Sequence, residues 1–364
     1  ATDATPEQVR KTFKASRIIG RRFKLVHVFN RSELIEVATF RSGEDSSNNG
    51  NLVKDTSGKI IRDNIWGDLE QDTYRRDFTI NALYYCPVSQ KIVGHKDGMK
   101  HIHEKSIVSI GDPVKRFSED PVRSLRAIRF SNKLNFKVDK DIKEAIYEKG
   151  HLLSDISNAR LFDEFCKIFL NGMAEKNFNK LSSFGLSKYL ISTESERSVF
   201  TRNLIVESLR NTDKRLMNSQ SITPGFLIAA LLWPELIGKS LSKGEINLRK
   251  FFRSMDYVLR NQQKITAVPR KFQSYIKDIW VLQLKLHSRI GKQPYKTLKH
   301  PRFRAAYDLL LIREKAANEK HSLGEWWTEF QKNDENLRKA LIDDLKEKNM
   351  QESPKIFGFS EELR

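Results

Sequence analysis

The stretch that most constrains the fold of this chain is RRDFTINALYY, at residues 75–85. Phe78, Ala82 and Tyr85 recur there at helical spacing, which predicts a helix with one apolar face. The first turn of such a helix presents unpaired backbone N–H groups, and these favour anions. We therefore expect the residues just before this helix to meet a charged ligand.

Two arginines stand in that position. Asp77 or Thr79 can cap the first turn, which places Arg75 and Arg76 on the approach to the helix N-terminus. Guanidinium groups beside an anion-binding helix start suit a polyphosphate. The alternative is an amphipathic helix with a solvated basic flank and no ligand.

The charge of the whole chain points to a polyanionic partner. Lys and Arg number 65 against 46 Asp and Glu, so the 364 residues carry a net charge of +19, which favours nucleic acid. The longest apolar run, residues 226–233, is too short to cross a membrane, and we expect no signal peptide. The two cysteines, Cys86 and Cys166, have no metal-type spacing, so we expect a reduced, cytoplasmic protein.

The pattern of elements changes near residue 112. Before it, residues 1–18 are predicted to be helical, with Pro6 at the first helical position. Short strand-like runs follow at 24–29, 34–40, 91–93 and 107–110. After it, the sequence predicts helices almost throughout. The clearest of these span residues 121–134, 139–149, 159–171, 224–232, 249–260, 271–287 and 302–320.

Glu36 stands in the middle of the predicted strand at 34–40. Because side chains alternate across a strand, Glu36 shares a face with Leu34, Ala38 and Phe40. A carboxylate among apolar residues is costly unless it is paired or bound to a metal. The alternative is an edge strand from which the glutamate reaches water.

Residues 119–123 read EDPVR and open the first of the later helices. Pro121 suits the first helical position, which makes Asp120 a good N-cap. Asp120 and Arg123 are three residues apart and share a face at the helix start. An acceptor and a planar guanidinium at fixed separation can read the edge of a base. Arg129 falls in the apolar arc of this helix, where a guanidinium needs a partner.

The RRDFT-N-L string at residues 75–83 resembles a motif of the nucleotidyltransferase family that contains bacterial poly(A) polymerases and class II tRNA CCA-adding enzymes. The resemblance implies an α+β fold with a polymerase-β-like α/β nucleotidyltransferase head, here at residues 1–112. An all-helical neck that binds nucleotide and RNA would follow at 113–175. A helical, RNA-binding C-terminal domain would occupy residues 176–364.

The resemblance also implies roles for individual residues. Asp77 and Glu36 would be catalytic, and Glu36 looks like the acidic residue beside the family's metal pair. ATP would be the substrate and Mg²⁺ the cofactor. The nucleotide-binding residues would come from RRDFT-N and ED-x-x-R, namely Arg75, Arg76, Asn81, Asp120, Arg123 and Arg126.

The family's main metal ligands are two aspartates spaced i, i+2, a few residues before a helix start that resembles ATPEQV. This sequence opens at residues 1–7 with ATDATPE. Asp3 lies too late for the pattern, between the expected aspartate pair and the helix. We therefore expect a head that is incomplete at its N-terminus and lacks these main ligands.

Three basic stretches resemble RNA-binding parts of the family or suit RNA. The GRRF string at 20–23 is similar to the poly(A) polymerase form, which would put Arg21 and Arg22 near phosphates or RNA. Residues 298–310, with Arg302 and Arg304, and residues 249–253 interleave basic and aromatic side chains, which suits phosphate neutralisation and base stacking. The alternative is that these aromatics belong to the core of amphipathic helices.

The resemblance implies a polynucleotide adenylyltransferase, which transfers AMP from ATP to the 3′-hydroxyl of RNA and releases pyrophosphate. Its partners would be RNA 3′ ends and ATP, with no membrane. The GRRF and EDP strings favour a poly(A) polymerase over a CCA-adding enzyme. A tRNA CCA-adding nucleotidyltransferase and a non-catalytic RNA-binding fragment remain the alternatives.

Overall fold

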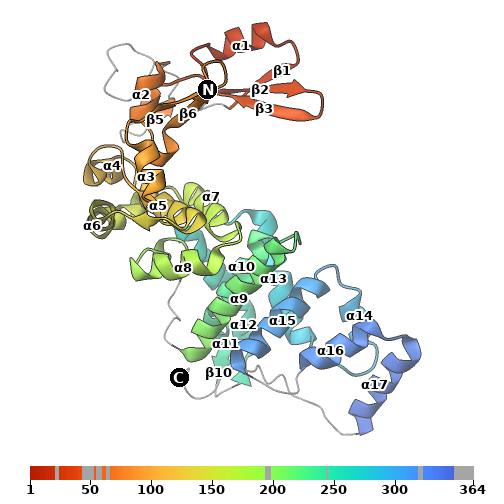
Figure 1. Ribbon diagram of the computed structural model, residues 1–364. Helices are drawn as coiled ribbons and strands as arrows, with labels where there is room; N and C mark the ends of the chain where they lie inside the picture. Colours follow the sequence, from red (N-terminus) through yellow and green to blue (C-terminus); the bar gives the residue numbers. More distant parts are fainter. Residues whose placement is uncertain are drawn as a thin grey trace. The chain divides into compact units, whose positions relative to one another are not determined.

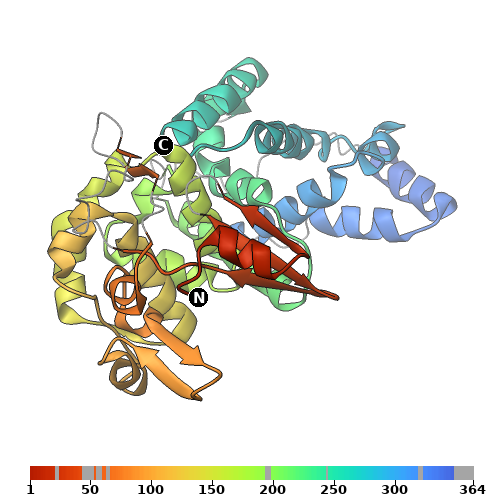
Figure 2. The same cartoon turned by 90° about the horizontal axis from the view of Figure 1, so that it is seen from above.

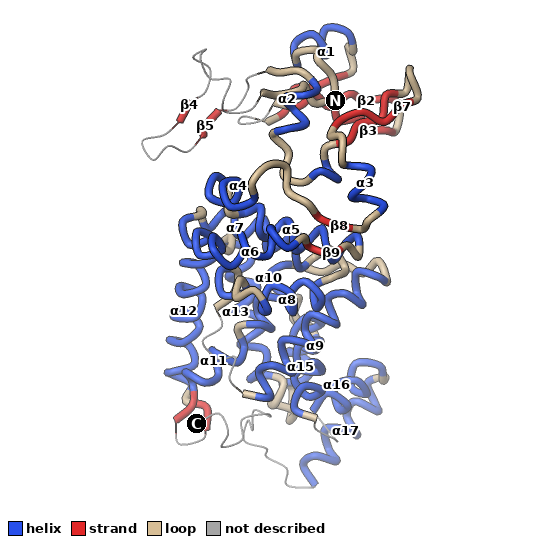
Figure 3. Tube along the Cα trace, turned by 60° about the vertical axis from the view of Figure 1, so that its left-hand side comes forward, coloured by secondary structure: helices blue, strands red, loops and turns tan. Residues whose placement is uncertain are grey.

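The computed structural model describes residues 1–20, 24–42, 53–54, 60–62, 66–192, 198–242, 245–318 and 323–347. The chain divides into two compact units, Ala1–Gly150 and His151–Arg364 (Figure 1). Figure 3 shows strands, helices and loops mixed in the first unit and helix through nearly all of the second. The finer boundaries at residues 112 and 175 stay predictions.

The first unit opens with helix α1 (Pro6–Thr12), whose start is fixed by local hydrogen bonds. Gln8 N donates to Thr5 Oγ1 at 3.3 Å, and Thr5 N donates to Gln8 Oε1 at 2.7 Å. This reciprocal capping box satisfies two backbone donors that the helix leaves open. It confirms the helix start that Thr5 and Pro6 predict.

A three-stranded antiparallel sheet follows. Its strands are β1 (Ser16–Ile19), β2 (Leu25–Asn30) and β3 (Glu33–Val37), in the order β1-β2-β3. Figure 2 shows α1 lying across this sheet, where Val9 of the helix packs with Val26 and Val28 of the central strand. Strands were predicted for the regions of β2 and β3, and β3 ends three residues before the predicted limit. Strand β1 was not predicted, because residues 1–18 were expected to be helical. The helix ends at Thr12 instead, and residues 16–19 pair with β2.

The middle of the unit differs from the expected helix at 78–85. A short 3-10 helix, η2 (Thr79–Asn81), is followed by strand β6 (Leu83–Cys86), which pairs antiparallel with β7 (Lys91–Gly94). The helical prediction was wrong because Leu83, Tyr84 and Tyr85 gain partners across this ladder, which their spacing along the chain does not reveal. The other elements of this region are β4 (Val53–Lys54), β5 (Ile60–Arg62), α2 (Leu69–Tyr74) and α3 (Gly98–His103).

The end of the unit is helical and is joined to the rest by a parallel strand pair. Helix α4 (Pro113–Glu119) leads into α5 (Val122–Leu134) and then α6 (Lys140–Lys149). Between them, β9 (Lys137–Val138) pairs with β8 (Ser106–Ile107). The fully buried side chains of this part include Phe78, Ile107, Phe117 and Leu125.

The second unit is built of packed helices, and the helices predicted from 159 onward are confirmed with small shifts of their ends. Trp280 Nε1 donates to the carbonyl oxygen of Ala229 at 2.9 Å, which joins two buried helices of its core. The residues Cys86 and Cys166 are free thiols. In the described part of the chain, we find no helix whose length and apolar character would let it span a membrane. The elements are η3 (Gly150–Asp155), α7 (Asn158–Phe169), α8 (Ala174–Ser183), η4 (Ser187–Tyr189), α9 (Val199–Met217), α10 (Pro224–Leu231), α11 (Trp233–Ser240), β10 (Leu241–Ser242), β11 (Glu245–Ile246), α12 (Leu248–Ile265), α13 (Arg270–Lys285), α14 (Gln293–Leu298), α15 (Phe303–Ala317), α16 (Leu323–Lys332) and α17 (Glu335–Glu347).

Candidate nucleotide-binding site

Asp72, near the end of α2, is the acceptor that holds the two arginines of the RRD string. Its carboxylate is 1% exposed. Arg75 Nε donates to Oδ1 at 2.8 Å, Arg76 Nη2 donates to Oδ2 at 2.6 Å, and the Tyr84 hydroxyl also donates to Oδ2. The two guanidinium groups are thereby fixed on one side of the helix end.

The electrostatics of this cluster favour a charged Asp72. Burial alone would raise the pKa of this carboxyl, but the Tyr84 hydroxyl and the cations of Arg75 and Arg76 outweigh it and lower the pKa to about 2. Burial would lower the pKa of Arg76, and the hydrogen bond and charge of Asp72 raise it instead. Arg76 therefore stays charged at neutral pH.

This arrangement corrects the expected position of the arginines. Arg75 is the C-cap of α2, so both arginines follow a helix end and do not precede a helix start. A cation at a helix C-terminus is also favoured by the helix dipole. The sequence contained a signal for Asp72 that we missed, because it lies three and four residues before the two arginines, at helical spacing.

Asp77, the last residue of the RRD string, joins the EDPVR segment. Arg123 Nε donates to Asp77 Oδ1 at 3.1 Å, and Arg126 Nη2 lies 2.7 Å from Oδ2. The side chain of Asp77 is only 11% exposed, so these ion pairs are shielded from water. The structure thus brings together three residues that the sequence predicted for one site.

Arg116 ties the same two segments together through the backbone. Its Nη2 donates to the carbonyl oxygens of Arg75 and Arg76, each at 2.9 Å, and its Nη1 donates to Glu119 Oε2 at 3.0 Å. Burial and the neighbouring charge of Arg123 lower the pKa of Arg116. No sequence pattern predicts this residue, since its partners lie 40 and 41 positions away.

At the start of α5, the two predicted base-reading residues, Asp120 and Arg123, both form hydrogen bonds within the protein. Asp120 Oδ1 accepts from Val122 N at 3.3 Å, so this carboxylate bonds to the first backbone N–H of the helix. Arg123 donates from Nη1 to the Arg116 carbonyl oxygen at 2.8 Å and to Glu119 Oε2 at 3.0 Å. Arg126 is more accessible than Arg123, at 37% exposed against 14%.

The turn that carries Asn81 is held by close backbone packing. Thr79 Oγ1 and His101 Nδ1 are 2.9 Å apart, and His95 N donates to the Ala82 carbonyl oxygen at 2.9 Å. Gly94 lies opposite with φ of +124°, and a Cβ atom there would come within 2.2 Å of that carbonyl oxygen. Only glycine fits at that position, and Asn81 is half-buried in this turn.

Arg129 has the aromatic neighbour that its apolar surroundings require. The guanidinium carbon lies 4.7 Å from the centre of the Phe130 ring. This is the geometry of a cation–π contact, which lets a cation pack against an apolar surface.

Glu36 does not lie among apolar neighbours as its strand face predicted. In the described sheet β3 is an edge strand, and the Glu36 side chain is 64% exposed and 3.4 Å from His27 Nε2. The open alternative, an edge-strand glutamate that reaches water, describes this position. Among the described residues, no three His, Cys, Asp or Glu side chains gather as a metal site would require, and Asp77 is engaged by two arginines. Glu36 and Asp77 therefore do not form a metal centre by themselves.

The predicted RNA-binding arginines have protein partners or lie outside the described part. Arg21 and Arg22 lie outside the described residues. The Arg302 guanidinium lies over the Tyr275 ring at 4.8 Å, and Arg304 Nε forms an ion pair with Asp308 Oδ1 at 3.0 Å. The aromatics of the 298–310 segment are core residues, since Phe303 and Tyr307 are buried.

Three family models match separate parts of the chain. The Poly A polymerase head domain matches residues 1–108, the Probable RNA and SrmB- binding site of polymerase A matches 135–193, and the Polymerase A arginine-rich C-terminus matches 243–356. The solved CCA-adding enzyme of Bacillus stearothermophilus in complex with CTP has a TM-score of 0.57 at 22% identity, covering 94% of this chain and 72% of its own. The α+β class with a nucleotidyltransferase head is thereby confirmed.

Whole-chain similarity points to one branch of this fold. The CCA-adding enzyme of Bacillus licheniformis is 32% identical over 197 residues, which are 54% of this chain and 47% of that enzyme. Poly(A) polymerase I of Salmonella typhi is 38% identical over 359 residues, which are 94% of this chain and 77% of the relative. For poly(A) polymerase I of Haemophilus influenzae the identity is 40% over 355 residues, with 94% and 78% covered. The chain therefore belongs to the family of bacterial poly(A) polymerases.

Proposed function

We propose that this protein transfers AMP from ATP to the 3′-hydroxyl of RNA and releases pyrophosphate. The observation that carries the proposal is the contact of Asp77 with Arg123 and Arg126, at 3.1 and 2.7 Å. It joins the RRD and EDPVR segments into one basic site, in a chain of the poly(A) polymerase family. Such a site suits a nucleoside triphosphate.

Arg75 and Arg76 are the residues that we assign to the triphosphate. Both guanidinium groups are oriented by Asp72, which leaves them little freedom to lose when the nucleotide binds. Fixed cations also stabilise the negative charge that moves onto the leaving pyrophosphate, without reorganisation during the reaction.

We assign nucleotide recognition to four residues, Asn81, Asp120, Arg123 and Arg126. Arg126 has the accessible guanidinium of this group, and Asp77 orients it. We assign to Asp77 the task of holding Arg123 and Arg126 in place for catalysis, since its two carboxylate oxygens accept from these two side chains. The head would occupy residues 1–112, the neck 113–175 and the C-terminal RNA-binding domain 176–364.

The family uses a divalent metal, and we propose Mg²⁺. The described residues do not assemble a site for it: Glu36 is exposed and Asp77 is engaged by arginines. We therefore assign no step of the reaction to the metal through these residues. The cytoplasm is the proposed location, which fits a protein that acts on ATP and RNA.

The test is nucleotide choice by the intact protein on a labelled RNA primer. With ATP alone it should add many residues, whereas CTP alone should support little addition. Arg123→Ala should lower AMP incorporation far more than RNA affinity, because the primer does not depend on this guanidinium. Lys133→Ala, an exposed position on the same helix, is the matched control and should behave as the unmodified protein. Addition of C, C and A only, to tRNA ends, would instead identify a CCA-adding enzyme.

A further inference from the structure

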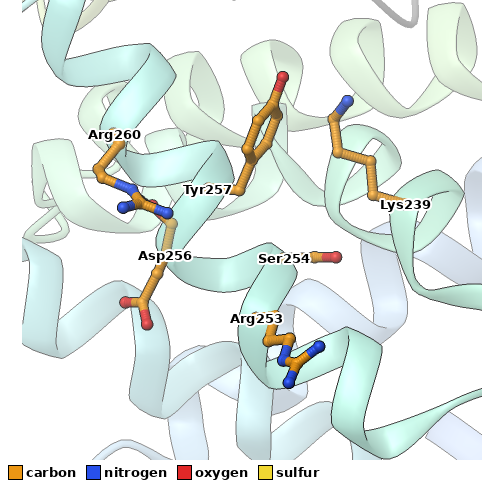
Figure 4. Close-up of a pocket in the computed structure, with 6 residues that line it drawn as sticks. All are labelled: Lys239, Arg253, Ser254, Asp256, Tyr257 and Arg260. Atoms are coloured by element: carbon orange, nitrogen blue, oxygen red, sulfur yellow. Dashed lines mark hydrogen bonds between the residues drawn. The ribbon is translucent and has the colours of Figure 1, made fainter.

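A basic depression lies in the second unit, between the end of α11 and the middle of α12. Figure 4 shows its lining, and the side chains of Lys239 and Tyr257 extend in the same direction from the two helices. Nothing in the nucleotide site uses these residues. The residues that line the depression are Lys239, Arg253, Ser254, Asp256, Tyr257 and Arg260.

Helix α12 has two unlike faces, and the depression lies on the basic one. One face is buried in the core of the unit through Phe251, Met255, Val258 and Leu259. The opposite face is exposed and carries five cations, which are Arg249, Lys250, Arg253, Arg260 and Lys264.

This face carries little negative charge of its own. Asp256 is the single acidic residue of α12, and its carboxylate is 2.6 Å from Lys277 Nζ of α13. Among the described residues, no carboxylate lies within ion-pair distance of Arg253. Like charges held on one helix destabilise each other, so the arrangement is one that a polyanion would relieve.

Aromatic rings stand among these cations. Tyr257 is 41% exposed and Phe252 is 48% exposed. The Lys239 ammonium lies 4.4 Å from the centre of the Tyr257 ring, which keeps one face of the phenol beside a positive charge. Phe251, the neighbour of Phe252 in sequence, is fully buried instead. The basic-aromatic interleaving of residues 249–253 therefore divides into one core ring and one surface ring.

We propose that this α12 face, defined by Phe252, Arg253, Tyr257 and Arg260 together with Lys239 at the end of α11, binds the single-stranded RNA upstream of the 3′ end. Arg253 and Arg260 are seven residues apart on one helix, about 10 Å along its axis. They therefore contact different phosphates. A base stacks on the exposed ring of Tyr257, which any base can do because each has a π-face.

The inference rests on the proposed function, because the ligand is the RNA substrate of that reaction. Exposed arginines alone would bind any anion, but a small inorganic anion has no ring that could stack on the exposed Tyr257 side chain. A protein partner would need an acidic surface, and it would compete with RNA for the same cations. The face thus adds affinity for RNA long enough to reach beyond the 3′ terminal nucleotides.

The first test uses the intact protein and single-stranded oligoadenylate of two lengths, about 5 and about 25 nucleotides. Arg253→Gln with Arg260→Gln should weaken binding of the long RNA about tenfold. It should also lower the slope of log affinity against log salt by about 1.4, since each phosphate contact on a single strand contributes about 0.7. Tyr257→Leu should weaken the long RNA by a similar factor and leave the slope unchanged. Lys332→Gln with Lys339→Gln, an exposed pair on α16 and α17, is the charge-matched control and should change the affinity for neither length beyond twofold.

The outcomes separate this inference from the proposed function. If the α12 face binds RNA, the variants raise KM for the long primer and leave kcat on the short primer unchanged. If they match the unmodified protein on both lengths while AMP is still added, the inference is wrong and the function stands. If the unmodified protein adds no AMP to any primer, the proposed function fails whatever the variants bind.

A second measurement covers variants that fold poorly and needs no substitution. Oligonucleotides carrying 4-thiouridine are crosslinked to the unmodified protein by light, and the linked peptides are mapped. Crosslinks within α12 are expected for positions upstream of the 3′ end. Crosslinks confined to other segments would overturn the proposal.

Discussion

Arg123 donates from its Nε to Asp77 Oδ1 across 3.1 Å, although the two residues are 46 positions apart in sequence. The contact is largely shielded from water, because the side chains are 14% and 11% exposed. Arg126 takes the other oxygen of the same carboxylate. Asp77 thus accepts from two donors on α5 although it lies outside that helix, and Glu119, the last residue of α4, also accepts from Arg123.

Replacing Asp77 by Asn should therefore damage the site more than a neutral change usually does. An amide offers one acceptor oxygen and no charge, so it cannot hold both guanidinium groups. A displacement of about 1 Å in a catalytic site can cost about 100-fold in rate, and we expect a loss of that order in AMP incorporation. Asp141→Asn, on the exposed surface of α6, serves as the control. Incorporation within twofold of normal for Asp77→Asn would contradict the role given to this carboxylate.

Replacing Asp72 by Asn should weaken nucleotide binding and lower the stability of the fold. Arg75 and Arg76 would lose the charge that orients them, so KM for ATP should rise at least about tenfold, roughly the effect of one charge-assisted hydrogen bond. The free energy of unfolding should fall by about 2 kcal/mol, since the carboxyl pKa lies near 2 and not near 3.8. Nucleotide titration and chemical denaturation measure the two effects. An unchanged KM with lowered stability would leave Asp72 a purely structural residue.

The second unit should lose stability as the pH falls below about 6.5. His287, which is buried near Arg313 and Arg289, has a pKa lowered to about 3, by burial first and then by the charges of these arginines. The unfolded chain takes up a proton at this residue below pH 6.5, whereas the folded chain does not, so acid favours unfolding. At pH 4 the cost is about 3 kcal/mol relative to neutral pH.

The measurement for this prediction is denaturation of the protein and of His287→Asn at several pH values. The variant cannot take up that proton, so its stability should fall less between pH 6.5 and pH 4. Carboxyl groups titrate in both proteins and cancel in the comparison. If the free energy of unfolding fell equally in both proteins over this range, His287 would not be the cause of the loss of stability in acid.

RNA binding should weaken steeply with salt. A net charge of +19 and the cations of the α12 face favour contacts with phosphates over reading of bases. With about five phosphate contacts, affinity for single-stranded RNA should drop about 100-fold between 50 and 200 mM salt. A titration by fluorescence anisotropy checks this. A change of less than threefold would mean that contacts other than ion pairs dominate.

Local sequence patterns predicted the elements that depend on neighbours along the chain. The capping box of Thr5 and Gln8 is formed by residues three apart, and the apolar period of α12 places Phe251 and Val258 in the core. The helix expected at 78–85 failed for the opposite reason. Tyr84 and Tyr85 obtain their conformation from Val93 and Ile92 of the next strand, and their spacing alone fits either structure.

In the candidate site, too, local patterns were predictable from the sequence and distant contacts were not. Arg75, Arg76, Asp77 and Arg123 could be named from their motifs, yet their partners could not. Asp72 was within reach, because its distance from the arginines is a helical period. Arg116 was not, because a guanidinium that donates to two backbone carbonyl oxygens leaves no trace in the residue types of its partners. The protonation states follow from burial, which only the folded chain defines.

Helix α5 is attached at both ends to one stretch of the first unit. Its N-terminal half is bound to Asp77 through Arg123 and Arg126, and just beyond its last turn β9 pairs in parallel with β8. A helix fixed at two points can neither slide along its axis nor swing about one end unless one attachment breaks. The spacing between the guanidinium groups of this helix and the RRD arginines is thus fixed by the folded unit before any ligand binds. Discrimination between bases in this site would then arise from fit to a rigid frame, and a poorly fitting base could not be accommodated by a small shift of the helix.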